Sequence, residues 1–498
     1  MPIVDARAPA WLKGAVVYQI FARSFADSDG DGTGDLDGIT AHLDYLASLG
    51  VNAIWLTPIH PTSSDHGYDV EDYDHVAKDL GGDAAFDRFQ RAAHARGLRI
   101  LLDGVFNHSS SKHPWFVSAR ESRASPLRER YIWSDAEPAG WARPWGGPVW
   151  YPTKTGFYYA LFSERMPDLN FRSEATQAEV VRIANGWLAR GVDGWRLDAA
   201  RHLVEDGPGK LTDRPETHSF WKRLRRETAA KFPESVLIGE TWTDVDTELP
   251  YAGDGDELHA AFDFDLQNAL AYGIQSANAL AITKAIGDLA KAPGFLAPFL
   301  GNHDQTRFAS RVGSAEAAAL GPELLLALPG PLFVYYGDEL GQQDGAQQGD
   351  AAKRCPMAWT GAPGGGFSGG KPYRDLPKGF EKANVAAESA DPASLLNLWR
   401  RLLAIRKARP ALEAAPLAVV NVAAPAVAYA RGTGEDALVV VANLSADAPA
   451  HVALAWPGAA ADGALVDLAH PDRAAARRAG GRVELDLGPR DAAWLARR

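Results

Sequence analysis

Eight short apolar runs, separated by longer amphipathic stretches, constrain the fold of this chain more than any other feature. The runs cover residues 15–21, 52–58, 98–106, 192–198, 235–241, 259–265, 297–304 and 330–339. Helical patterns lie between them at 35–50, 83–97 and 174–191. Strands that are apolar on both faces and alternate with helices are typical of parallel sheets covered by helices. Eight such strands predict an α/β fold of the (β/α)8 TIM barrel type.

Two regions depart from this alternation. Residues 104–170, after the third strand, are loop-like and far longer than an ordinary strand-to-helix connection. After residue 410, short strand patterns with turn residues between them occur at 417–422, 426–431, 437–445, 451–456 and 482–488. The sequence therefore predicts three domains. They are a barrel (1–103 and 171–410), an inserted subdomain (104–170) and a C-terminal antiparallel β-sandwich (411–498).

Several of the 15 tryptophans fall between residues 133 and 152, in a Pro/Gly-rich part of the insertion. Tryptophan ordinarily fills cores. In an irregular segment its flat apolar faces also suit sugar rings, so both interpretations stay open.

The bulk composition argues against several classes of function. A net charge of −12 lacks the basic patch that binds nucleic acid, and no apolar run is long enough to cross a membrane. The N-terminal residues show no basic region followed by an apolar one, and the single Cys355 allows no internal disulfide. We expect a cytoplasmic protein with neither nucleic-acid nor membrane partners, and a monomer as the simplest oligomeric state.

The segment 27–35 carries closely spaced oxygen ligands: Asp27, Asp29, Asp31, Thr33 and Asp35. Its start matches an EF-hand loop, but the last ligand position is Gly38 instead of glutamate, and a strand pattern precedes it. Two interpretations remain, a solvated turn and a loop in which the carboxylates and the Thr33 carbonyl bind a divalent cation. Four neighbouring carboxylates would repel one another without a cation, which favours the metal.

Polar side chains gather where the predicted strands end: Asp103, Asn107, His108, Arg196, Asp198, Glu240, Asn302, His303 and Asp304. Any one of the aspartates could cap a helix, but capping does not explain several carboxylates together with two histidines and an arginine. The strand ends of a parallel barrel meet at one face, so we expect these side chains to converge. Two carboxyls are what cleavage of an acetal needs, one as acid and one to stabilise or attack the anomeric carbon.

Motifs in four places resemble the signature regions of the α-amylase family (glycoside hydrolase family 13). They are DGVFNH (103–108), GWRLDAARH (194–202), GETW (239–242) and FLGNHD (299–304). Auxiliary regions also match: GAVVYQIFARSF (14–25), HGYDVEDY (66–73), MPDLN (166–170) and GPLFVYYGDELG (330–341). The resemblance covers about residues 11–410 and lies between the oligo-1,6-glucosidase and neopullulanase branches.

The resemblance implies a retaining glycosidase with three catalytic residues. Asp198 would be the nucleophile that forms a covalent glycosyl-enzyme, and Glu240 the acid that later activates water. Asp304 would stabilise the distorted sugar ring. Retention requires roughly 5–5.5 Å between the carboxyls of nucleophile and acid. Arg196 would keep Asp198 ionised by charge pairing.

The resemblance also implies a sugar-binding set: Tyr68, Asp69, His66, His108, Arg196, His303, Arg307, Arg201, His202 and Phe367. His108 and His303 would bond the sugar next to the nucleophile, Tyr68 would stack on it, and Arg307 would lie near Asp69. Arg201–His202 replaces the commoner Lys-His that contacts the leaving-group side. Arginine keeps the charge there but changes the geometry. Phe367, in the glycine-rich segment 355–375, would stack on a sugar, unless that segment is only a flexible surface loop.

The segment 27–35 matches an Asp-rich loop that binds structural Ca²⁺ or Mg²⁺ in related branches of the family. A second calcium site of other α-amylases uses an asparagine equivalent to Asn107 and an aspartate where this chain has Asn170. We therefore do not predict that second ion.

Ala199, directly after the predicted nucleophile, resembles the α-1,4-acting members of the family. We expect hydrolysis of α-1,4-glucosidic bonds in maltooligosaccharides or starch-type glucans. The alternatives are an α-glucosidase or 4-α-glucanotransferase with the same three carboxylates and, more remotely, a non-catalytic sugar-binding relative.

Overall fold

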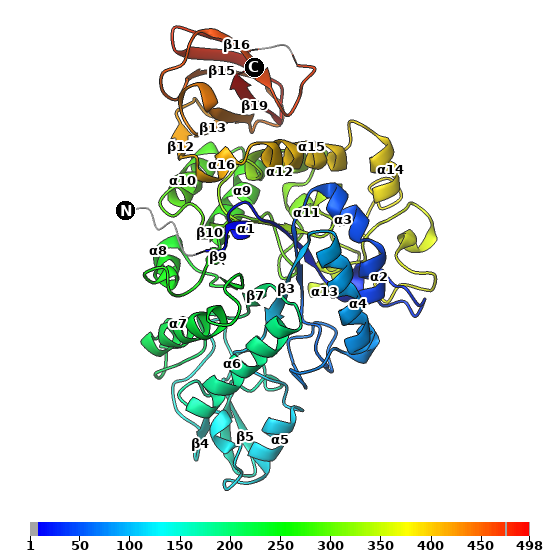
Figure 1. Ribbon diagram of the computed structural model, residues 1–498, viewed down its shortest axis with the longest axis vertical. Helices are drawn as coiled ribbons and strands as arrows, with labels where there is room; N and C mark the ends of the chain where they lie inside the picture. Colours follow the sequence, from blue (N-terminus) through cyan, green and yellow to red (C-terminus); the bar gives the residue numbers. More distant parts are fainter. Residues whose placement is uncertain (1–7, 474–475, 498) are drawn as a thin grey trace.

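The computed structural model describes residues 8–473 and 476–497 (Figure 1). Three sheets occur in these ranges: one parallel and eight-stranded, one antiparallel and eight-stranded, and a small three-stranded one. The outermost residues of the predicted first and last domains, 1–7 and 498, lie outside the described residues. In the part of the chain described, no helix is long and apolar enough to cross a membrane.

The parallel sheet is the predicted barrel. Its strands are β1 (Val16–Ile20), β2 (Ala53–Leu56), β3 (Arg99–Gly104), β7 (Gly194–Leu197), β8 (Val236–Gly239), β9 (Ala260–Phe262), β10 (Leu296–Ala297) and β11 (Leu332–Tyr335). They pair in the order β10-β9-β8-β7-β3-β2-β1-β11, and a parallel bridge from Phe299 to Phe333 closes the ring. Buried side chains such as Val17, Trp55 and Phe262 pack together in one core. The TIM barrel prediction is confirmed.

Helices connect and surround the strands. The α-helices of the barrel and its extensions are α1 (Ala10–Lys13), α2 (Leu36–Ala41), α3 (Leu43–Leu49), α4 (Gly82–Ala95), α6 (Glu174–Ala189), α7 (Pro215–Ala229), α8 (Val245–Glu248), α9 (Phe264–Ser276), α10 (Ala279–Leu289), α11 (Phe308–Val312), α12 (Ala315–Leu325), α13 (Asp350–Lys353), α14 (Val385–Ala390), α15 (Leu395–Ala408) and α16 (Ala411–Ala414). Short 3₁₀ helices are η1 (Ala22–Ser24), η2 (Lys78–Leu80), η3 (Arg128–Arg130), η4 (Leu249–Ala252), η5 (Asp338–Leu340), η6 (Pro363–Gly366) and η7 (Gly434–Asp436).

The helix predicted at 35–50 is broken into two. His42 leaves the helical conformation (φ −109°, ψ 12°) while its ring nitrogen bonds the Gly38 carbonyl at 2.9 Å. The break separates α2 from α3. Gly38 itself lies so close to the chain after β1 that a Cβ there would meet the Ala26 carbonyl oxygen at 2.1 Å.

The insertion after β3 forms its own small unit at the lower end of the molecule in Figure 1. It contains α5 (Pro114–Glu121) and an antiparallel sheet of β4 (Trp133–Ser134), β6 (Gly156–Tyr159) and β5 (Trp150–Thr153). The predicted inserted subdomain is therefore present. Its limits at 104 and 170, like the other domain limits, stay predictions.

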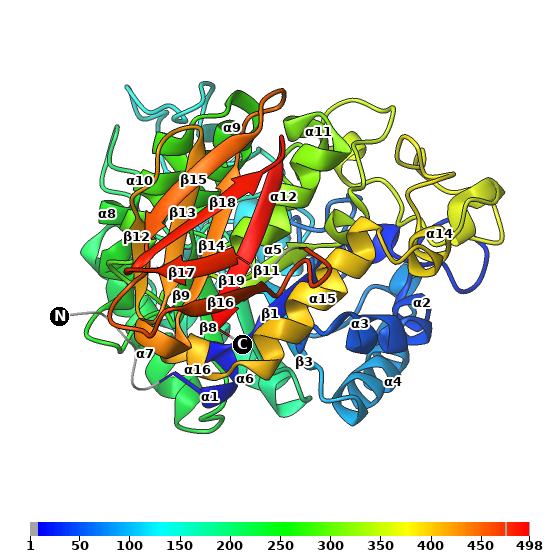
Figure 2. The same cartoon turned by 90° about the horizontal axis from the view of Figure 1, so that it is seen from above.

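The C-terminal region is an antiparallel, barrel-like sheet that packs beside α9, α10 and α12 (Figure 2). Its strands are β12 (Leu417–Val420), β13 (Ala426–Arg431), β14 (Leu438–Asn443), β15 (Ala450–Ala455), β16 (Gly463–Asp467), β17 (Ala476–Ala479), β18 (Arg482–Leu487) and β19 (Asp491–Arg497). The predicted C-terminal antiparallel domain is confirmed, although β16, β17 and β19 were not predicted. Trp494 of β19 donates to the Glu323 carbonyl of α12 at 2.9 Å, which joins this domain to the barrel.

Candidate active site

A cleft of about 410 Å³ opens where the barrel strands end at their carboxyl side. Asp198 follows β7, Glu240 follows β8, and Asp304 lies in the loop after β10. All three side chains line this one cleft, as the sequence predicts for a single site. Its full lining is His66, Tyr68, His108, Trp145, Phe162, Met166, Asp198, Ala199, Glu240, Trp242, Asp304, Asp350 and Arg354.

One buried guanidinium holds three carboxyls together beneath the cleft. Arg196 Nη1 donates to Asp103 at 2.7 Å and to Asp198 at 2.8 Å, while its Nη2 lies 2.5 Å from Glu240. The Arg196 side chain is 1% exposed. Asp198 and Glu240 therefore lie side by side on adjacent nitrogens of one planar group, which fixes their relative positions.

Burial makes these carboxyls difficult to ionise. It raises the pKa of Asp198 to about 7, that of Glu240 to about 7 and that of Asp103 to about 6. Arg196 acts in the predicted direction and lowers the pKa of Asp198, but one positive charge shared by three carboxyls does not outweigh burial. The cluster therefore retains a proton near neutral pH, as an acid–base pair requires.

The pKa of Asp304 shifts in the opposite direction. Burial raises its pKa, but His303, Arg354 and Arg196 together outweigh burial, so the pKa of Asp304 lies below its usual value. Arg354 Nη2 donates to Asp304 Oδ1 at 2.7 Å and to Asp350 at 3.2 Å. Asp304 is thus a carboxylate held ionised beside two carboxyls of raised pKa.

Tyr68 and the two predicted histidines form a second network. Gln19 donates to His303 Nδ1 at 2.7 Å, so the ring proton lies on Nε2, which faces the Tyr68 hydroxyl at 2.6 Å. Tyr68 in turn donates to Asp103 at 2.9 Å and stacks on the His303 ring. Burial lowers the pKa of His303 to about 3 and that of His108 to about 4, so both rings are neutral. His66 also lines the cleft, as predicted.

Four of the predicted sugar-binding residues lie outside the cleft lining and contact other groups of the protein. Arg307 is buried, donates to the Tyr336 carbonyl at 2.8 Å and makes no ion pair with Asp69. Asp69 accepts instead from Thr62, Ser63 and Ser64. Arg201 holds Asp213 at 2.9 and 2.6 Å, outside the cleft lining. His202 packs edge-on against Phe162, with 5.7 Å between ring centroids.

Phe367 does not face the cleft. Its side chain is buried (1% exposed) and its carbonyl accepts from the Asp27 amide at 2.9 Å. The segment 355–375 therefore packs against the loop 27–35 at this point, and the ring has no open face for a sugar.

Sequence reasoning missed several residues of the cleft, among them Arg354, Trp145 and Trp242. Arg354 follows α13 in a loop without a matched motif, so no local pattern marks it. Trp145 and Trp242 are 56% and 49% exposed and line the cleft. The concentration of tryptophans at 133–152 was the sequence signal for Trp145, and the end of the GETW motif was the signal for Trp242.

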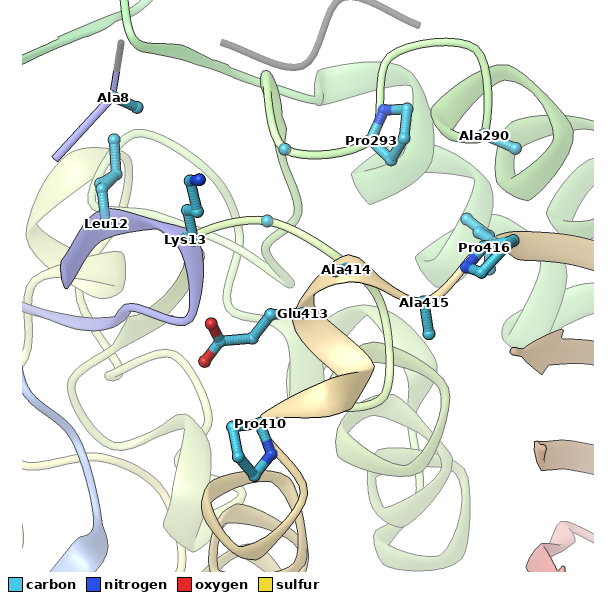
Figure 3. Close-up of a pocket in the computed structure, with 13 residues that line it drawn as sticks. Ala8, Leu12, Lys13, Ala290, Pro293, Pro410, Glu413, Ala414, Ala415 and Pro416 are labelled. Carbon is cyan, nitrogen blue, oxygen red and sulfur yellow. The ribbon is translucent and has the colours of Figure 1, made fainter. Parts of the chain in front are cut away.

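A cavity of about 500 Å³ lies at the opposite, amino-terminal side of the barrel (Figure 3). It is bordered by Leu12 and Lys13 before β1, Pro293 before β10, and Glu413 and Pro416 near β12. Apolar surface dominates its lining, and none of the carboxylates described above reaches it. Size alone therefore does not identify the site of chemistry.

The loop 27–35 brings part of the predicted metal set together. Carboxylate oxygens of Asp27, Asp29 and Asp35 all lie within 4.8 Å of one another. Asp31 is not in this group, and its carboxylate accepts from the Thr33 amide at 2.7 Å. Burial raises the pKa of Asp27, but hydrogen bonds from Ser368 and from the amides of residues 29, 30 and 32 lower it by a larger amount. The pKa of Asp27 therefore lies below its usual value. Carboxylate oxygens grouped in this way fit a hard divalent cation.

Comparison with known proteins identifies similar chains. A family model described as "Alpha amylase, catalytic domain" matches residues 19–415. The chain is 36% identical to "Alpha-amylase 3" of Dictyoglomus thermophilum, covering 87% of this chain and 85% of that protein. It is 33% identical to a "Trehalose synthase/amylase TreS" of Mycobacterium tuberculosis, covering 88% and 82%.

Among solved structures, the "alpha-glucosyl transfer enzyme, XgtA" superposes with a TM-score of 0.88 at 32% identity. The match covers 99% of this chain and 100% of that one. The names of the relatives differ in activity, between amylase, trehalose synthase and, at similar identity, α-glucosidase.

Proposed function

Because the chain belongs to the α-amylase family, we propose that it is a retaining hydrolase of α-1,4-glucosidic bonds in maltooligosaccharides and starch-type glucans. Members of this family are glycosidases and transglycosylases that act on α-glucans. The observation that carries the proposal is the pair Asp198 and Glu240 on one guanidinium, with Asp304 lining the same cleft. Adjacent carboxyls favour the close spacing of a retaining pair over the wider spacing that an intervening water needs.

The proposed reaction has two steps. In the first, Asp198 attacks the anomeric carbon while the Glu240 proton passes to the glycosidic oxygen, so the bond to the leaving sugar breaks and a glycosyl-enzyme forms. In the second, Glu240 takes a proton from water, whose oxygen bonds the anomeric carbon and releases Asp198. Two inversions give net retention. Asp304 would hold sugar hydroxyls near the developing positive charge, and neutral His108 and His303 would bond the same ring.

An α-glucosidase is the second candidate, favoured by one observation. Arg354 and Asp350 line the same cleft as Asp304, and Arg354 bonds both carboxylates. These bonded side chains would close the cleft beyond one glucosyl unit, which would suit removal of single glucose units from a chain end.

Product analysis on maltoheptaose tests both candidates. An amylase is expected to release maltose and maltotriose from the first minutes, because several sugars bind on each side of the cleaved bond. Thin-layer chromatography of a time course makes the measurement. Glucose as the sole early product would establish the α-glucosidase, and saccharides longer than the input would establish a transferase. An unchanged substrate would contradict catalysis altogether.

For the metal, we propose that Asp27, Asp29 and Asp35 hold a structural Ca²⁺ or Mg²⁺, with Asp31 and the Thr33 carbonyl as further candidates. The support is the proximity of the three carboxylates. The ion would fasten the loop after β1 to the segment 367–373. These already touch through the Ser368 hydroxyl on Asp27 and through the Tyr373 amide on the Gly32 carbonyl at 2.9 Å. Gly32 (φ +97°) is required there, because a Cβ would meet the Lys371 carbonyl oxygen.

Removal of the cation is expected to lower stability. At a free ion concentration of about 100 times Kd the bound ion contributes about 2.7 kcal/mol, so chelation lowers the midpoint of thermal unfolding and added Ca²⁺ or Mg²⁺ restores it. Asp29→Asn should abolish the response, whereas Asp37→Asn, an aspartate of α2 outside the cluster, should keep it. A midpoint indifferent to chelator in metal-free buffer would contradict the site.

A further inference from the structure

Gln19 is a polar residue inside the barrel core. Every residue of β1 is buried, and its side chains alternate between the two sides of the strand. Val17 packs with Trp55 in the core inside the barrel, whereas Tyr18 belongs to the core shared with the surrounding helices. Gln19 lies two residues beyond Val17, so it points into the barrel, one layer nearer the active site. A buried amide there is costly unless it is hydrogen-bonded.

The bonding partner of this amide is His303. Gln19 Nε2 lies 2.7 Å from His303 Nδ1. An amide nitrogen donates and does not accept, so it occupies the lone pair of Nδ1. That lone pair is where the imidazole ring would bind a second proton. A proton on Nδ1 would therefore meet the amide N–H head-on, and the geometry disfavours the charged ring.

The other ring nitrogen lies beside a carboxylate. His303 Nε2 is 3.2 Å from Asp304 Oδ2 and 2.6 Å from the Tyr68 hydroxyl. A histidine next to a carboxylate ordinarily has a raised pKa and becomes charged. Asp304 acts in this direction on the pKa of His303, but burial lowers that pKa by a larger amount. The charged groups around the ring are Asp304, Arg354, Arg196 and Lys353.

The charge of the ring decides how much of Asp304 remains available. Arg354 already bonds Asp304 Oδ1 at 2.7 Å. A charged His303 would bind Oδ2 in an ion pair, and both carboxylate oxygens would then be engaged by cations. Hydrogen bonds from neutral donors are about half as strong as charge-assisted ones. A neutral His303 therefore leaves Oδ2 free to exchange its partner for a sugar hydroxyl.

We propose that Gln19 is a positioning residue that keeps His303 neutral, so that Asp304 retains one oxygen for the substrate. This inference rests on the proposed function and deepens it, because it assigns a role to a residue below the cleft that is not among its lining residues. Gln19 acts only through His303. It supplies a donor where a carboxylate or a water molecule would accept the second proton.

The first test measures the protonation of His303 directly. Gln19→Glu has nearly the same shape but places an acceptor at Nδ1, so the pKa of His303 should rise and both ring nitrogens should carry protons at about pH 6. Gln19→Leu removes the donor without adding a charge and should raise this pKa less. NMR of ¹⁵N-labelled histidine distinguishes the states. The chain has 13 histidines, so the His303 signals are assigned by their loss in His303→Gln.

The second test measures activity against pH. Because the variant ring is charged below its raised pKa, Gln19→Glu should lose about tenfold in kcat/KM on maltoheptaose at about pH 5.5, the effect of one charge-assisted hydrogen bond. The ratio of variant to wild-type activity should recover as pH rises through the pKa of His303 in the variant. A merely structural defect would lower the ratio equally at every pH.

Gln267→Glu is the matched control, since Gln267 is also buried and donates its amide to a carbonyl, that of Leu300, at 2.8 Å. It should lower the midpoint of thermal unfolding, as a buried charge does, but keep a neutral His303 and a ratio independent of pH. If Gln19→Glu does not fold, Gln19→Leu carries both measurements, because leucine suits the apolar core.

A His303 ring that stays neutral at about pH 5 in both Gln19 variants would overturn the proposal. A wild-type ring protonated on both nitrogens at about pH 6 would also overturn it, because Gln19 would then present its oxygen. A pH-independent loss of activity in Gln19→Glu would overturn the link to Asp304. A wild-type protein with the expected spectrum but inert toward maltoheptaose would overturn the proposed function, while the control of His303 by Gln19 would stand.

Discussion

Glu240→Gln is expected to lower kcat/KM for maltooligosaccharides by about a hundred- to ten-thousandfold, the contribution typical of a positioned acid. Glutamine has the same shape and can still accept from Arg196, but its amide does not protonate a leaving oxygen. Initial rates on maltoheptaose measure the loss. Glu248→Gln is a matched control, because Glu248 is a buried glutamate of raised pKa near the same loop but outside the cleft lining. The control should keep activity.

Two further readouts separate a lost acid from a damaged fold. The fluoride of α-D-glucosyl fluoride leaves without protonation, so Glu240→Gln should form the glycosyl-enzyme from it, and added azide should speed turnover because azide attacks without a base. The raised pKa of Glu240, about 7, means that the acid is protonated below that pH. Wild-type kcat/KM should therefore fall as pH rises through about 7, and this limb should vanish in the variant. Wild-type activity in Glu240→Gln would contradict the assignment.

Local sequence patterns predicted the barrel because each strand carries its own signal. A buried run such as 98–106 needs no knowledge of its neighbours to be read as a strand, and the polar residues at strand ends converge by the geometry of a parallel barrel. The same reasoning missed β17 (Ala476–Ala479), since its sequence ARRA has no apolar alternation. That strand exists because β16 and β18 pair with it on both sides.

Side-chain contacts that depend on the tertiary structure were less predictable from the sequence. Arg307 was expected near Asp69, but it packs over the rings of Tyr335 and Tyr336, and Arg354 from the loop after β11 enters the cleft instead. Nothing in either arginine's neighbouring residues distinguishes these fates. Phe367 was predicted as a sugar platform from its glycine-rich context, yet burial against the loop 27–35 decides its role. Long loops carry few periodic constraints, so their side-chain directions follow from packing alone.

Arg196→Leu is expected to lower the free energy of unfolding by about 3–5 kcal/mol, because it leaves three buried carboxyls without their cation. Asp103, Asp198 and Glu240 all lose their bond to the guanidinium. Thermal or urea unfolding measures the deficit. Arg88→Leu is the control, since Arg88 and its partner Asp37 are both largely exposed and such pairs contribute little. Catalysis should also be lost, because Arg196 would no longer fix the relative positions of the Asp198 and Glu240 carboxyls.

The loss of unfolding free energy in Arg196→Leu should depend on pH. The direction of this dependence follows from the number of protons bound by the folded and unfolded states. Burial raises the pKa values of the three carboxyls in the folded protein above the unfolded values near 4, so the folded state binds more protons between about pH 4 and 7. Stability then falls as pH rises through this window, and more steeply without Arg196. We expect a smaller deficit at pH 5 than at pH 8. Asp103→Asn in the Arg196→Leu background removes one unpaired charge and should recover part of the loss at pH 8. The loss of unfolding free energy in Arg196→Leu could instead be equal at both pH values and unchanged by Asp103→Asn. That result would mean that Arg196 acts through packing and not through its charge.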